Sequence, residues 1–432
     1  MVHLRSWKND PSRKPLIIKG ARQVGKSTIV RQLGREFASL AEVNLEIEPR
    51  LSSIFEQDLE PDRIVRDLSI TMGRKIVPGE TLLFLDEIQA CPRALTSLRY
   101  FDEKLPRLHV VAAGSLLDFA LEEVGVPVGR VTFLHLYPMT FLEFVSATGN
   151  GMLRSTVETH DPLRELPLPV HERLLGLVGQ YMAVGGMPEA VARWVETGDL
   201  LACARVHDDL VGAFVQDFSR YARRNQRPHV RTVFDAIPRL LGRKFVFSSA
   251  AADVRSRTLR SALDLLSAAQ VAHVVCHSSS NGLPLGAEAN PRLFKVILLD
   301  VALAQSVLGL DPGEWILHPG ETIVNRGPMC EAFVGQEILA HGRPARREEL
   351  FYWTRENRGS QAEVDYVLAA GGSVIPVEVK SGSAGSLRSM HLFLESKRGS
   401  PFGIQISRGN FSATGRIRRF PLYAVSRALP VG

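Results

Sequence analysis

The chain has 432 residues, of which 45% are apolar and 23% are charged, so it is long enough for about two to four domains. This composition is that of an ordinary globular protein and excludes a disordered or collagen-like chain. No stretch has the length and apolarity of a membrane span, and the polar N-terminal segment lacks the apolar core of a signal peptide. Because the cysteines lie far apart and form no zinc motif, we expect free thiols in a reducing cytoplasm.

The net charge of +6 and the isoelectric point near 9.2 are compatible with nucleic-acid binding but do not show it. The distribution of arginines is more informative than the total. One group comprises Arg223, Arg224 and Arg227, and a second comprises Arg255, Arg257 and Arg260. Each group is either a binding surface or simply a solvated face.

The first chemical motif follows a short apolar run, P-L-I-I-K at residues 15–19, which predicts a strand. Residues 20–28 then read G-A-R-Q-V-G-K-S-T, the phosphate-binding pattern G-x-x-x-x-G-K-[ST], and a segment with helical apolar spacing follows. Gly20 and Gly25 let backbone N–H groups face phosphate oxygens, while the helix beginning near Lys26 directs its positive dipole end at the same anion. We therefore predict a nucleotide-binding loop.

The polar side chains of this loop have distinct expected roles. Lys26 would neutralise charge on the β- and γ-phosphates, and Ser27 would offer its hydroxyl group to Mg²⁺. A glycine-rich turn without nucleotide is the alternative, which the complete motif disfavours. The predicted cofactors are therefore ATP and Mg²⁺, and the predicted nucleotide-binding residues are Gly20, Gly25, Lys26, Ser27 and Thr28.

A second motif lies in T-L-L-F-L-D-E-I-Q at residues 81–89, an apolar run that ends in two carboxylates. The run is typical of a buried central strand in a parallel sheet. Asp86 would hold Mg²⁺ through water, and Glu87 would polarise the attacking water. An acidic pair after a strand is common by itself, but after a complete phosphate-binding loop it predicts hydrolysis of ATP.

Two further residues suit a nucleotide site. Ser115 ends the next predicted strand, R-L-H-V-V-A-A-G-S, and could sense the γ-phosphate, or it is simply a turn residue. Arg130 stands at the mouth of a further strand. This succession resembles the AAA-type ATPases, and the resemblance implies that Arg130 reaches the ATP of a neighbouring subunit. Pairing of Arg130 with local carboxylates is the alternative.

Two more stretches narrow the resemblance. Residues 134–144, L-H-L-Y-P-M-T-F-L-E-F, and residues 181–190, Y-M-A-V-G-G-M-P-E-A, look like markers of one bacterial and archaeal branch of these ATPases. Its members carry a C-terminal domain of unknown function after the AAA-type domain. The resemblance covers most of the chain.

The middle of the chain is mainly helical. We expect a helical lid, then helices at about residues 229–241, 247–254 and 255–270, and then a pair of β-like runs. Three helices and a wing describe a winged-helix module. Its third helix would carry the nucleic-acid contacts, which we expect at Arg255, Arg257, Thr258 and Arg260. A winged helix used only for packing between subunits is the alternative.

The C-terminal region reads as a helix, three strands, a helix and a strand, the core order of restriction-endonuclease-like nucleases. In that fold a carboxylate on the second strand and an E-x-K on the third converge on Mg²⁺. Residues i and i+2 of a strand face the same side, so Glu378 and Lys380 point together. Asp365 and Glu378 would ligate the metal, Lys380 would position or activate water, and Glu337 would complete the shell.

The E-x-K pattern has little weight alone. A second copy at residues 395–397 ends a helical pattern, whereas Glu378 and Lys380 lie in an apolar strand and follow Asp365. A surface hairpin with charges would look the same over these few residues. Whether such a domain cuts DNA stays open at this point, because related domains bind without cleaving.

The sequence therefore predicts an α/β protein with four regions: an AAA-type core at 1–150, a helical lid at 151–226, a winged-helix-like module at 227–298 and a restriction-endonuclease-like domain at 299–432. The expected function is ATP hydrolysis with Mg²⁺ that remodels or translocates on DNA, including branched DNA. The alternative is an ATP-dependent switch or scaffold whose C-terminal domain serves oligomerisation or protein docking. DNA is the expected partner, together with further copies of the chain in a ring or dimer.

Overall fold

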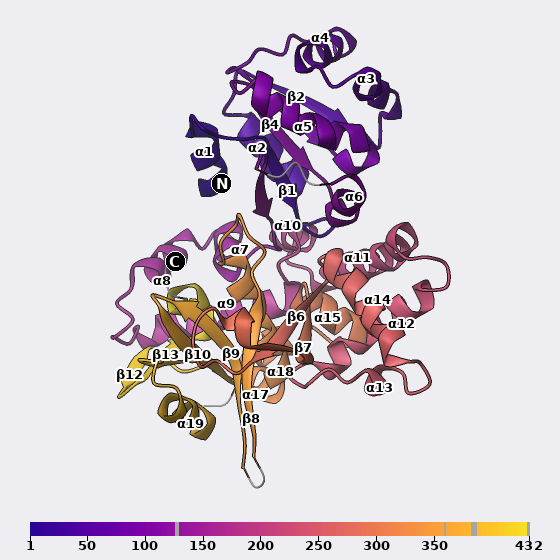
Figure 1. Cartoon of the computed structure of the whole chain (residues 1–432). Helices are drawn as coiled ribbons and strands as arrows, with labels where there is room; N and C mark the ends of the chain where they lie inside the picture. The colour runs from indigo at the N-terminus through magenta and orange to yellow at the C-terminus, as the bar shows by residue number, and fades with distance from the viewer. Residues whose placement is uncertain (126–128, 358–359, 382–386, 430–432) are drawn as a thin grey trace. The chain divides into compact units, whose positions relative to one another are not determined.

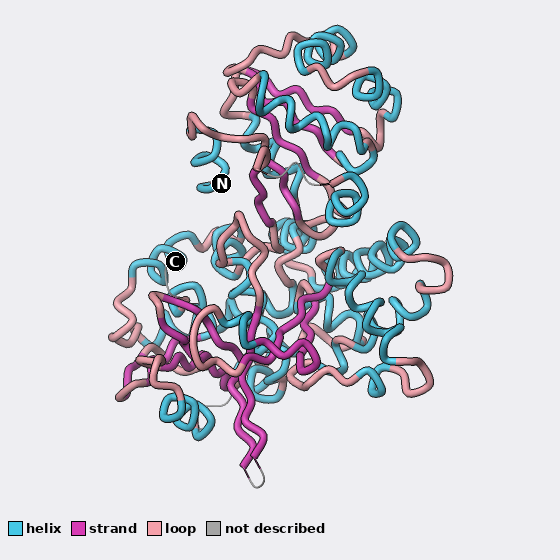
Figure 2. Tube along the Cα trace, in the orientation of Figure 1, coloured by secondary structure: helices cyan, strands magenta, loops and turns pink. Residues whose placement is uncertain are grey.

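The computed structural model describes residues 1–125, 129–357, 360–381 and 387–429 of the chain (Figure 1). One unit comprises Met1–Tyr137 with Arg343–Arg347, and the other comprises Pro138–Gly342 with Glu348–Gly432. The short return segment belongs to the first unit, where the His135 N–H donates to the Pro344 carbonyl at 2.7 Å. Each unit has its own sheet (Figure 2).

The sheet of the first unit is five-stranded, parallel throughout, and ordered β2-β3-β4-β1-β5. Its strands are β1 (Leu16–Lys19), β2 (Ser39–Asn44), β3 (Thr81–Asp86), β4 (His109–Ala113) and β5 (Thr132–His135). Its helices are α1 (Val2–Asn9), α2 (Lys26–Gly34), α3 (Ser52–Gln57), α4 (Pro61–Thr71), α5 (Pro92–Lys104) and α6 (Leu117–Val124), with 3₁₀ turns η1 (Pro49–Leu51) and η2 (Ile88–Ala90). Strand β4 thus separates the strand before the phosphate-binding loop from the strand that ends at Asp86.

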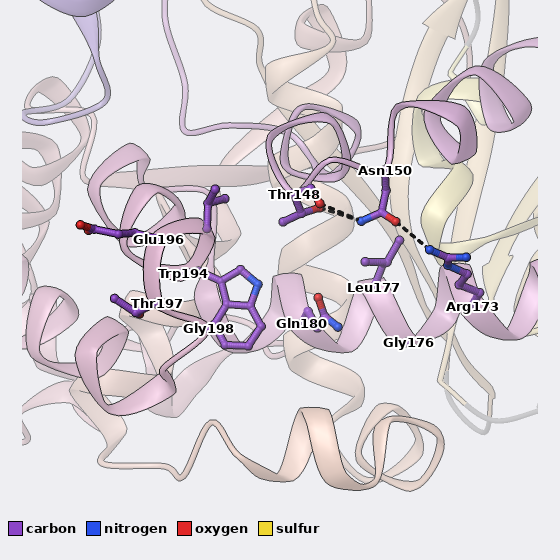
Figure 3. A pocket seen from close by; sticks show the side chains of 11 residues that line it. Thr148, Asn150, Arg173, Gly176, Leu177, Gln180, Trp194, Glu196, Thr197 and Gly198 are labelled. Atoms are coloured by element: carbon purple, nitrogen blue, oxygen red, sulfur yellow. Dashed lines mark hydrogen bonds between the residues drawn. The ribbon is translucent and has the colours of Figure 1, made fainter.

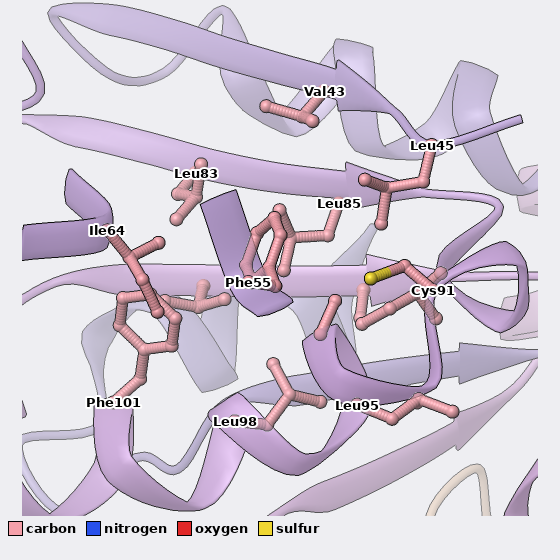
Figure 4. Packing of buried hydrophobic residues seen from close by; sticks show 14 of the residues in the cluster. Val43, Leu45, Phe55, Ile64, Leu83, Leu85, Cys91, Leu95, Leu98 and Phe101 are labelled. Carbon is pink, nitrogen blue, oxygen red and sulfur yellow. The ribbon is translucent and has the colours of Figure 1, made fainter. Parts of the chain in front are cut away.

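Both faces of this sheet are buried. Along β3, Leu83 and Leu85 pack into one apolar cluster, and Leu82 and Phe84 pack into another on the opposite face. All four side chains are fully buried. Alternation of side chains along a strand explains this division, and Figure 4 shows the first cluster between the sheet and its helices, including Phe101. The uninterrupted apolar run at residues 82–85 is therefore the pattern of a strand covered on both sides.

The second unit is rich in helices, and most of them precede its sheet strands in the chain. Its helices are α7 (Phe141–Ala147), α8 (Gly151–Thr159), α9 (Leu168–Val184), α10 (Pro188–Thr197), α11 (Leu200–Tyr221), α12 (Arg227–Ala236), α13 (Phe247–Ala250), α14 (Ser256–Ala268), α15 (Val301–Leu308), α16 (Glu314–Leu317), α17 (Pro319–Asn325), α18 (Gly327–Ala340), α19 (Arg388–Ser396) and α20 (Val425–Ala428). Shorter 3₁₀ turns are η3 (Pro238–Leu240), η4 (Leu285–Glu288) and η5 (Leu422–Ala424). No helix among the described residues combines the length and apolarity needed to cross a membrane.

The sheet of the second unit is eight-stranded and mixed, with the order β12-β13-β11-β10-β9-β8-β6-β7. Its strands are β6 (Ala272–Ser278), β7 (Ala289–Leu298), β8 (Leu350–Asn357), β9 (Ser360–Ala370), β10 (Ser373–Lys380), β11 (Gly403–Ser407), β12 (Ser412–Thr414) and β13 (Ile417–Pro421). Strands β8, β9 and β10 pair antiparallel in succession, and β10 pairs parallel with β11.

The predicted boundary at residue 298 is not reproduced. Helices α12, α13 and α14 and the antiparallel pair β6–β7 follow one another in the expected order, but β6 also pairs in parallel with β8. The register places Val275 beside Leu350. The expected wing is therefore part of the C-terminal sheet, and the three regions predicted after residue 150 form one unit. A two-stranded hairpin leaves a strand edge free, and here β8 covers it.

Candidate functional site

The phosphate-binding loop connects β1 to α2 and depends on both of its glycines. A Cβ atom at Gly20 would lie 2.5 Å from the Leu136 carbonyl oxygen, so only glycine fits at this approach. Gly25 precedes α2 with a φ of +92°, in the left-handed region that glycine adopts without strain. Helix α2 then begins at Lys26, with its N-terminal N–H groups directed at the loop.

Lys26 holds its ammonium group inside the curve of the loop. The Nζ atom donates to the Gly20 carbonyl at 3.0 Å and to the Ala21 carbonyl at 2.8 Å. Burial lowers the pKa of Lys26 to about 8, although Glu87 and Asp86 act in the opposite direction. A buried cation within reach of loop N–H groups is suited to bind a phosphate chain.

Ser27 and Asp86 come together although β1 and β3 are not neighbouring strands. The Ser27 hydroxyl group donates to Asp86 Oδ2 at 2.9 Å, and Asn44 Nδ2 approaches the same oxygen at 3.4 Å. Burial raises the pKa of Asp86, and the bond from Ser27 opposes this. A hydroxyl and a carboxylate oxygen side by side fit the oxygen preference of Mg²⁺, so these residues can hold the ion that the motif implies. Asn44, the last residue of β2, belongs to no motif of the sequence.

Glu87 directly follows β3 in a left-handed conformation, with a φ of +48°. Its Oε2 accepts a hydrogen bond from Gln89 Nε2 at 2.5 Å. The Gln89 side chain passes so close to Gly114 that a Cβ there would lie 1.9 Å from Oε1. Gln89 thus fixes the carboxylate of Glu87 against the end of β4. No motif indicates this role of Gln89, and its only signal in the sequence is a glutamine two positions after Glu87.

Ser115 and Arg130 lie at different edges of the sheet. Ser115 follows β4, whose neighbours are β1 and β3, at the edge where the loop lies. Arg130 precedes β5, and because Thr132 pairs with Leu16 it lies at the opposite, amino-terminal edge. It is half-exposed and forms ion pairs with two carboxylates of α5, Asp102 at 3.5 Å and Glu103 at 3.3 Å. Within the single chain, Arg130 therefore pairs with local carboxylates. Its expected contact with the ATP of a neighbouring subunit stays a prediction, because that contact needs a second copy of the chain.

Three of the four residues expected at a nuclease site gather on β9 and β10. Glu378 Oε1 pairs with Lys380 Nζ at 2.6 Å, and Asp365 Oδ2 accepts from the Val379 N–H at 2.7 Å. Burial raises the pKa of both Asp365 and Glu378. Glu378 Oε2 is buried, and a backbone hydrogen bond from Met390 acts to lower the pKa of this carboxyl group, against the effect of burial.

The fourth expected residue lies elsewhere, which corrects the predicted shell. Glu337 is buried in α18, and its Oε1 accepts from the Phe141 N–H at 2.8 Å, at the start of α7. The carboxylate of α18 that faces Asp365 is Glu331. The two glutamates are six positions apart, which turns them to different sides of the helix.

A lysine that the sequence argument overlooked occupies the centre of this group. Lys295, on β7, is 2% exposed. Its Nζ lies 2.8 Å from Glu331 Oε1, 2.6 Å from Glu363 Oε1 and 3.9 Å from Asp365 Oδ1. No group of three or more His, Cys, Asp or Glu side chains in the described ranges is arranged to hold a metal ion. The expected shell of Asp365, Glu378 and Glu337 is therefore not assembled among the described residues, because Glu337 faces α7 instead.

The arginines of α14 differ in their availability. Arg255 and Arg257 are exposed. Arg260 is folded back, with Nε donating to Asp264 at 3.1 Å, Nη1 donating to the Pro291 carbonyl at 3.1 Å, and the guanidinium over the Phe294 ring. Thr258 is half-buried. Two of the four expected contacts are thus presented to solvent.

The second unit also has a pocket of about 650 Å³ that no motif indicated (Figure 3). Three of its polar residues bond to one another: Arg173 donates to Asn150 Oδ1 at 3.1 Å, and Asn150 donates to the Thr148 carbonyl at 3.1 Å. The apolar part of the lining comes from Trp194 and Leu177. No motif of the sequence maps to this lining, and we assign no ligand to the pocket.

Comparison with known proteins assigns the first unit. Residues 12–145 match a family described as an AAA domain, whereas residues 176–314 and 326–424 match two families described as domains of unknown function, DUF8612 and DUF4143. No curated protein matches the chain.

Three solved structures show weak similarity. The Walker-type ATPase PABY2304 of Pyrococcus abyssi has 16% identity, with 71% of this chain and 93% of that chain covered at a TM-score of 0.45. C. elegans PCH-2 has 12% identity, with coverage of 46% and 62% and a TM-score of 0.27. The STAND protein PH0952 of Pyrococcus horikoshii, which has a tetratricopeptide repeat sensor, has 10% identity, with coverage of 78% and 48% and a TM-score of 0.26. The AAA-domain match at residues 12–145 contains both the phosphate-binding loop and the Asp86–Glu87 pair, so the chain carries an ATPase domain of the AAA type.

Proposed function

We propose that the protein hydrolyses ATP with Mg²⁺ in the first unit and uses the hydrolysis to act on DNA. The contact between Ser27 and Asp86 carries the hydrolytic part of the proposal, because it joins the hydroxyl and carboxylate oxygens that hold Mg²⁺ in such sites. The bound ion would neutralise charge on the phosphate oxygens. Lys26 would supply a further positive charge beside the β- and γ-phosphates.

The residues of the site suit an in-line attack by water. The Glu87 carboxylate accepts a proton from the water whose oxygen attacks the γ-phosphorus. The bond from that phosphorus to the bridging oxygen breaks, and ADP and inorganic phosphate leave. Gln89 keeps the Glu87 side chain oriented through the bond at 2.5 Å. Nothing in this step requires a group from the second unit.

The DNA part of the proposal rests on charge. The chain is basic overall, and Arg255 and Arg257 at the start of α14 are exposed. Neutralising DNA phosphates releases counterions, so binding should weaken steeply with salt. We therefore propose DNA, including branched DNA, as the substrate on which ATP turnover acts, with further copies of the chain supplying Arg130.

The test is a salt titration of binding to duplex and four-way-junction DNA by the full chain. Replacing Arg255 and Arg257 with alanine should reduce the slope of log K against log salt by about 1.8, because each phosphate contact contributes about 0.9. The matched control replaces Arg50 and Arg66, which are exposed in the first unit, and should leave the slope unchanged. Binding that is absent or independent of salt would contradict the DNA assignment.

A second candidate function has its own supporting observation. Carboxylates of α18 and β9, namely Glu331, Glu363 and Asp365, already surround Lys295. This favours a C-terminal domain that docks a protein or a second chain, with ATP controlling the docking. In that case the full chain would hydrolyse ATP but show no salt-dependent DNA binding in the titration above.

A further inference from the structure

The carboxylates on β9 and α18 are neutralised by a lysine that lies outside residues 326–424, the range that matches the C-terminal family. Lys295 belongs to β7, within residues 176–314, whereas Glu331, Glu363 and Asp365 fall within residues 326–424. The parallel pairing of β6 with β8 brings the hairpin that carries Lys295 into the same sheet. The lysine is therefore contributed by the preceding region of the chain.

The contacts of Lys295 are those of a bound cation. Its Nζ atom lies within hydrogen-bonding distance of two carboxylate oxygens, 2.8 Å from Glu331 and 2.6 Å from Glu363. The centroid of the Tyr352 ring lies 5.3 Å from Nζ. Burial acts to lower the pKa of Lys295, but the carboxylates outweigh burial and raise it, so the ammonium group stays charged. A charged lysine in this position satisfies acidic groups that would otherwise repel each other.

A divalent ion does not fit beside this lysine. Mg²⁺ approaches its oxygen ligands to about 2.0–2.1 Å and keeps several water molecules. An ion bound by Asp365 would therefore lie close to the Lys295 ammonium group, which is 3.9 Å from Asp365 Oδ1 and already bonds to Glu331 and Glu363. Glu378 Oε1 is likewise held, by Lys380 at 2.6 Å. The other oxygen of this carboxylate, Glu378 Oε2, is buried and offers a single ligand atom. An added buried dication would also lie close to two ammonium groups, which disfavours it strongly.

We infer that the Lys295 ammonium group is the resident cation of this carboxylate group, so that the C-terminal domain binds no divalent ion there and does not cut DNA. The domain keeps the strand arrangement and the E-x-K residues expected of a nuclease, but a side chain holds its acidic groups together. This inference is independent of ATP hydrolysis in the first unit. It also lets the domain bind DNA or protein without cleavage.

The first test measures binding of Mn²⁺ to the full chain by the loss of the free-ion electron paramagnetic resonance signal. Replacing Ser27 with alanine and Asp86 with asparagine in every sample removes the site for the ATP-bound ion. This parent should bind no Mn²⁺ at millimolar concentrations, whereas adding Lys295→Met should create a stoichiometric site. The control is Lys397→Met, because Lys397 bonds to Asn281 and not to these carboxylates. Stoichiometric binding by the parent that Asp365→Asn abolishes would overturn the inference.

Two additional measurements keep the test decisive if Lys295→Met does not fold. The variant Lys295→Met with Glu331→Gln removes one charge of each sign. It should fold and bind Mn²⁺ with a Kd at least about tenfold below the highest Mn²⁺ concentration at which the parent binds none. In a separate assay, wild-type chain and Glu378→Ala should leave duplex and four-way-junction DNA equally intact in Mg²⁺ or Mn²⁺. Cleavage by wild type that Glu378→Ala abolishes would refute the inference, while ATP turnover, measured in parallel, reports separately on the first unit.

Discussion

The buried ammonium group of Lys26 should make ATP binding depend on pH. Its pKa is lowered to about 8 because burial disfavours the charged form. Roughly 90% of chains then carry the charged lysine at pH 7, and roughly 10% at pH 9. Because the phosphates bind the charged form, we expect the Kd for ATP to rise about tenfold from pH 7 to pH 9.

The lowered pKa of Lys26 also determines how the free energy of unfolding depends on pH. An unfolded lysine keeps its ordinary pKa of 10.5, so between pH 8 and 10.5 the unfolded chain binds more protons than the folded chain. The contribution of Lys26 to the free energy of unfolding therefore rises with pH in this window and is least favourable below pH 8. A shift of this size corresponds to about 3 kcal/mol.

Isothermal titration calorimetry with a non-hydrolysable ATP analogue checks the binding prediction. Titrations at pH 7 and pH 9, each in two buffers of different ionisation enthalpy, give the Kd and the number of protons taken up. The control is Lys26→Arg, whose guanidinium stays charged across this range and should give a Kd independent of pH. Equal Kd values for wild type at both pH values, without proton uptake at pH 9, would refute the argument.

The remaining predictions concern turnover. Glu87→Gln should keep ATP binding but lower the rate of phosphate release by about 10²–10⁴, the usual contribution of a general base, and an unchanged rate in single-turnover experiments would exclude this role. Arg130→Ala removes half-exposed ion pairs and should change the free energy of unfolding by less than about 1 kcal/mol. The same substitution should reduce ATP turnover only at concentrations where the chain self-associates. Full turnover by strictly monomeric wild-type protein would contradict a contact between Arg130 and the ATP of a neighbouring subunit.

The nucleotide site was the most predictable part because its residues lie in short local patterns. Parallel strands place their carboxyl ends at one edge of the sheet, so the loop after β1 and the carboxylates after β3 meet although β4 lies between them. The pattern gave no sign of Asn44, and for Gln89 it offered only the presence of a glutamine shortly after the acidic pair. Their roles depend on side-chain directions after strand ends, which periodicity does not describe.

The carboxylates of the C-terminal domain show where sequence reasoning was insufficient. Helix α18 is buried on nearly all sides, so apolar spacing could not show which of its two glutamates faces Asp365. Lys295 carried no signal beyond being a lysine in an apolar run, and its partners lie 36 or more positions away in the chain. Such a contact depends on long-range strand pairing, which a local pattern cannot specify.

The pairing of β6 with β8 also constrains how the second unit is made. These strands are parallel and far apart in sequence, so β6 and β7 emerge from the ribosome long before the strand that covers the edge of β6. Until β8 follows, the newly made chain exposes backbone N–H and C=O groups that invite pairing with other chains. A gene product that stopped between the two family ranges, at about residue 320, would keep that open edge permanently. In this chain, the regions that match the two families of unknown function thus share one sheet and belong to one compact unit.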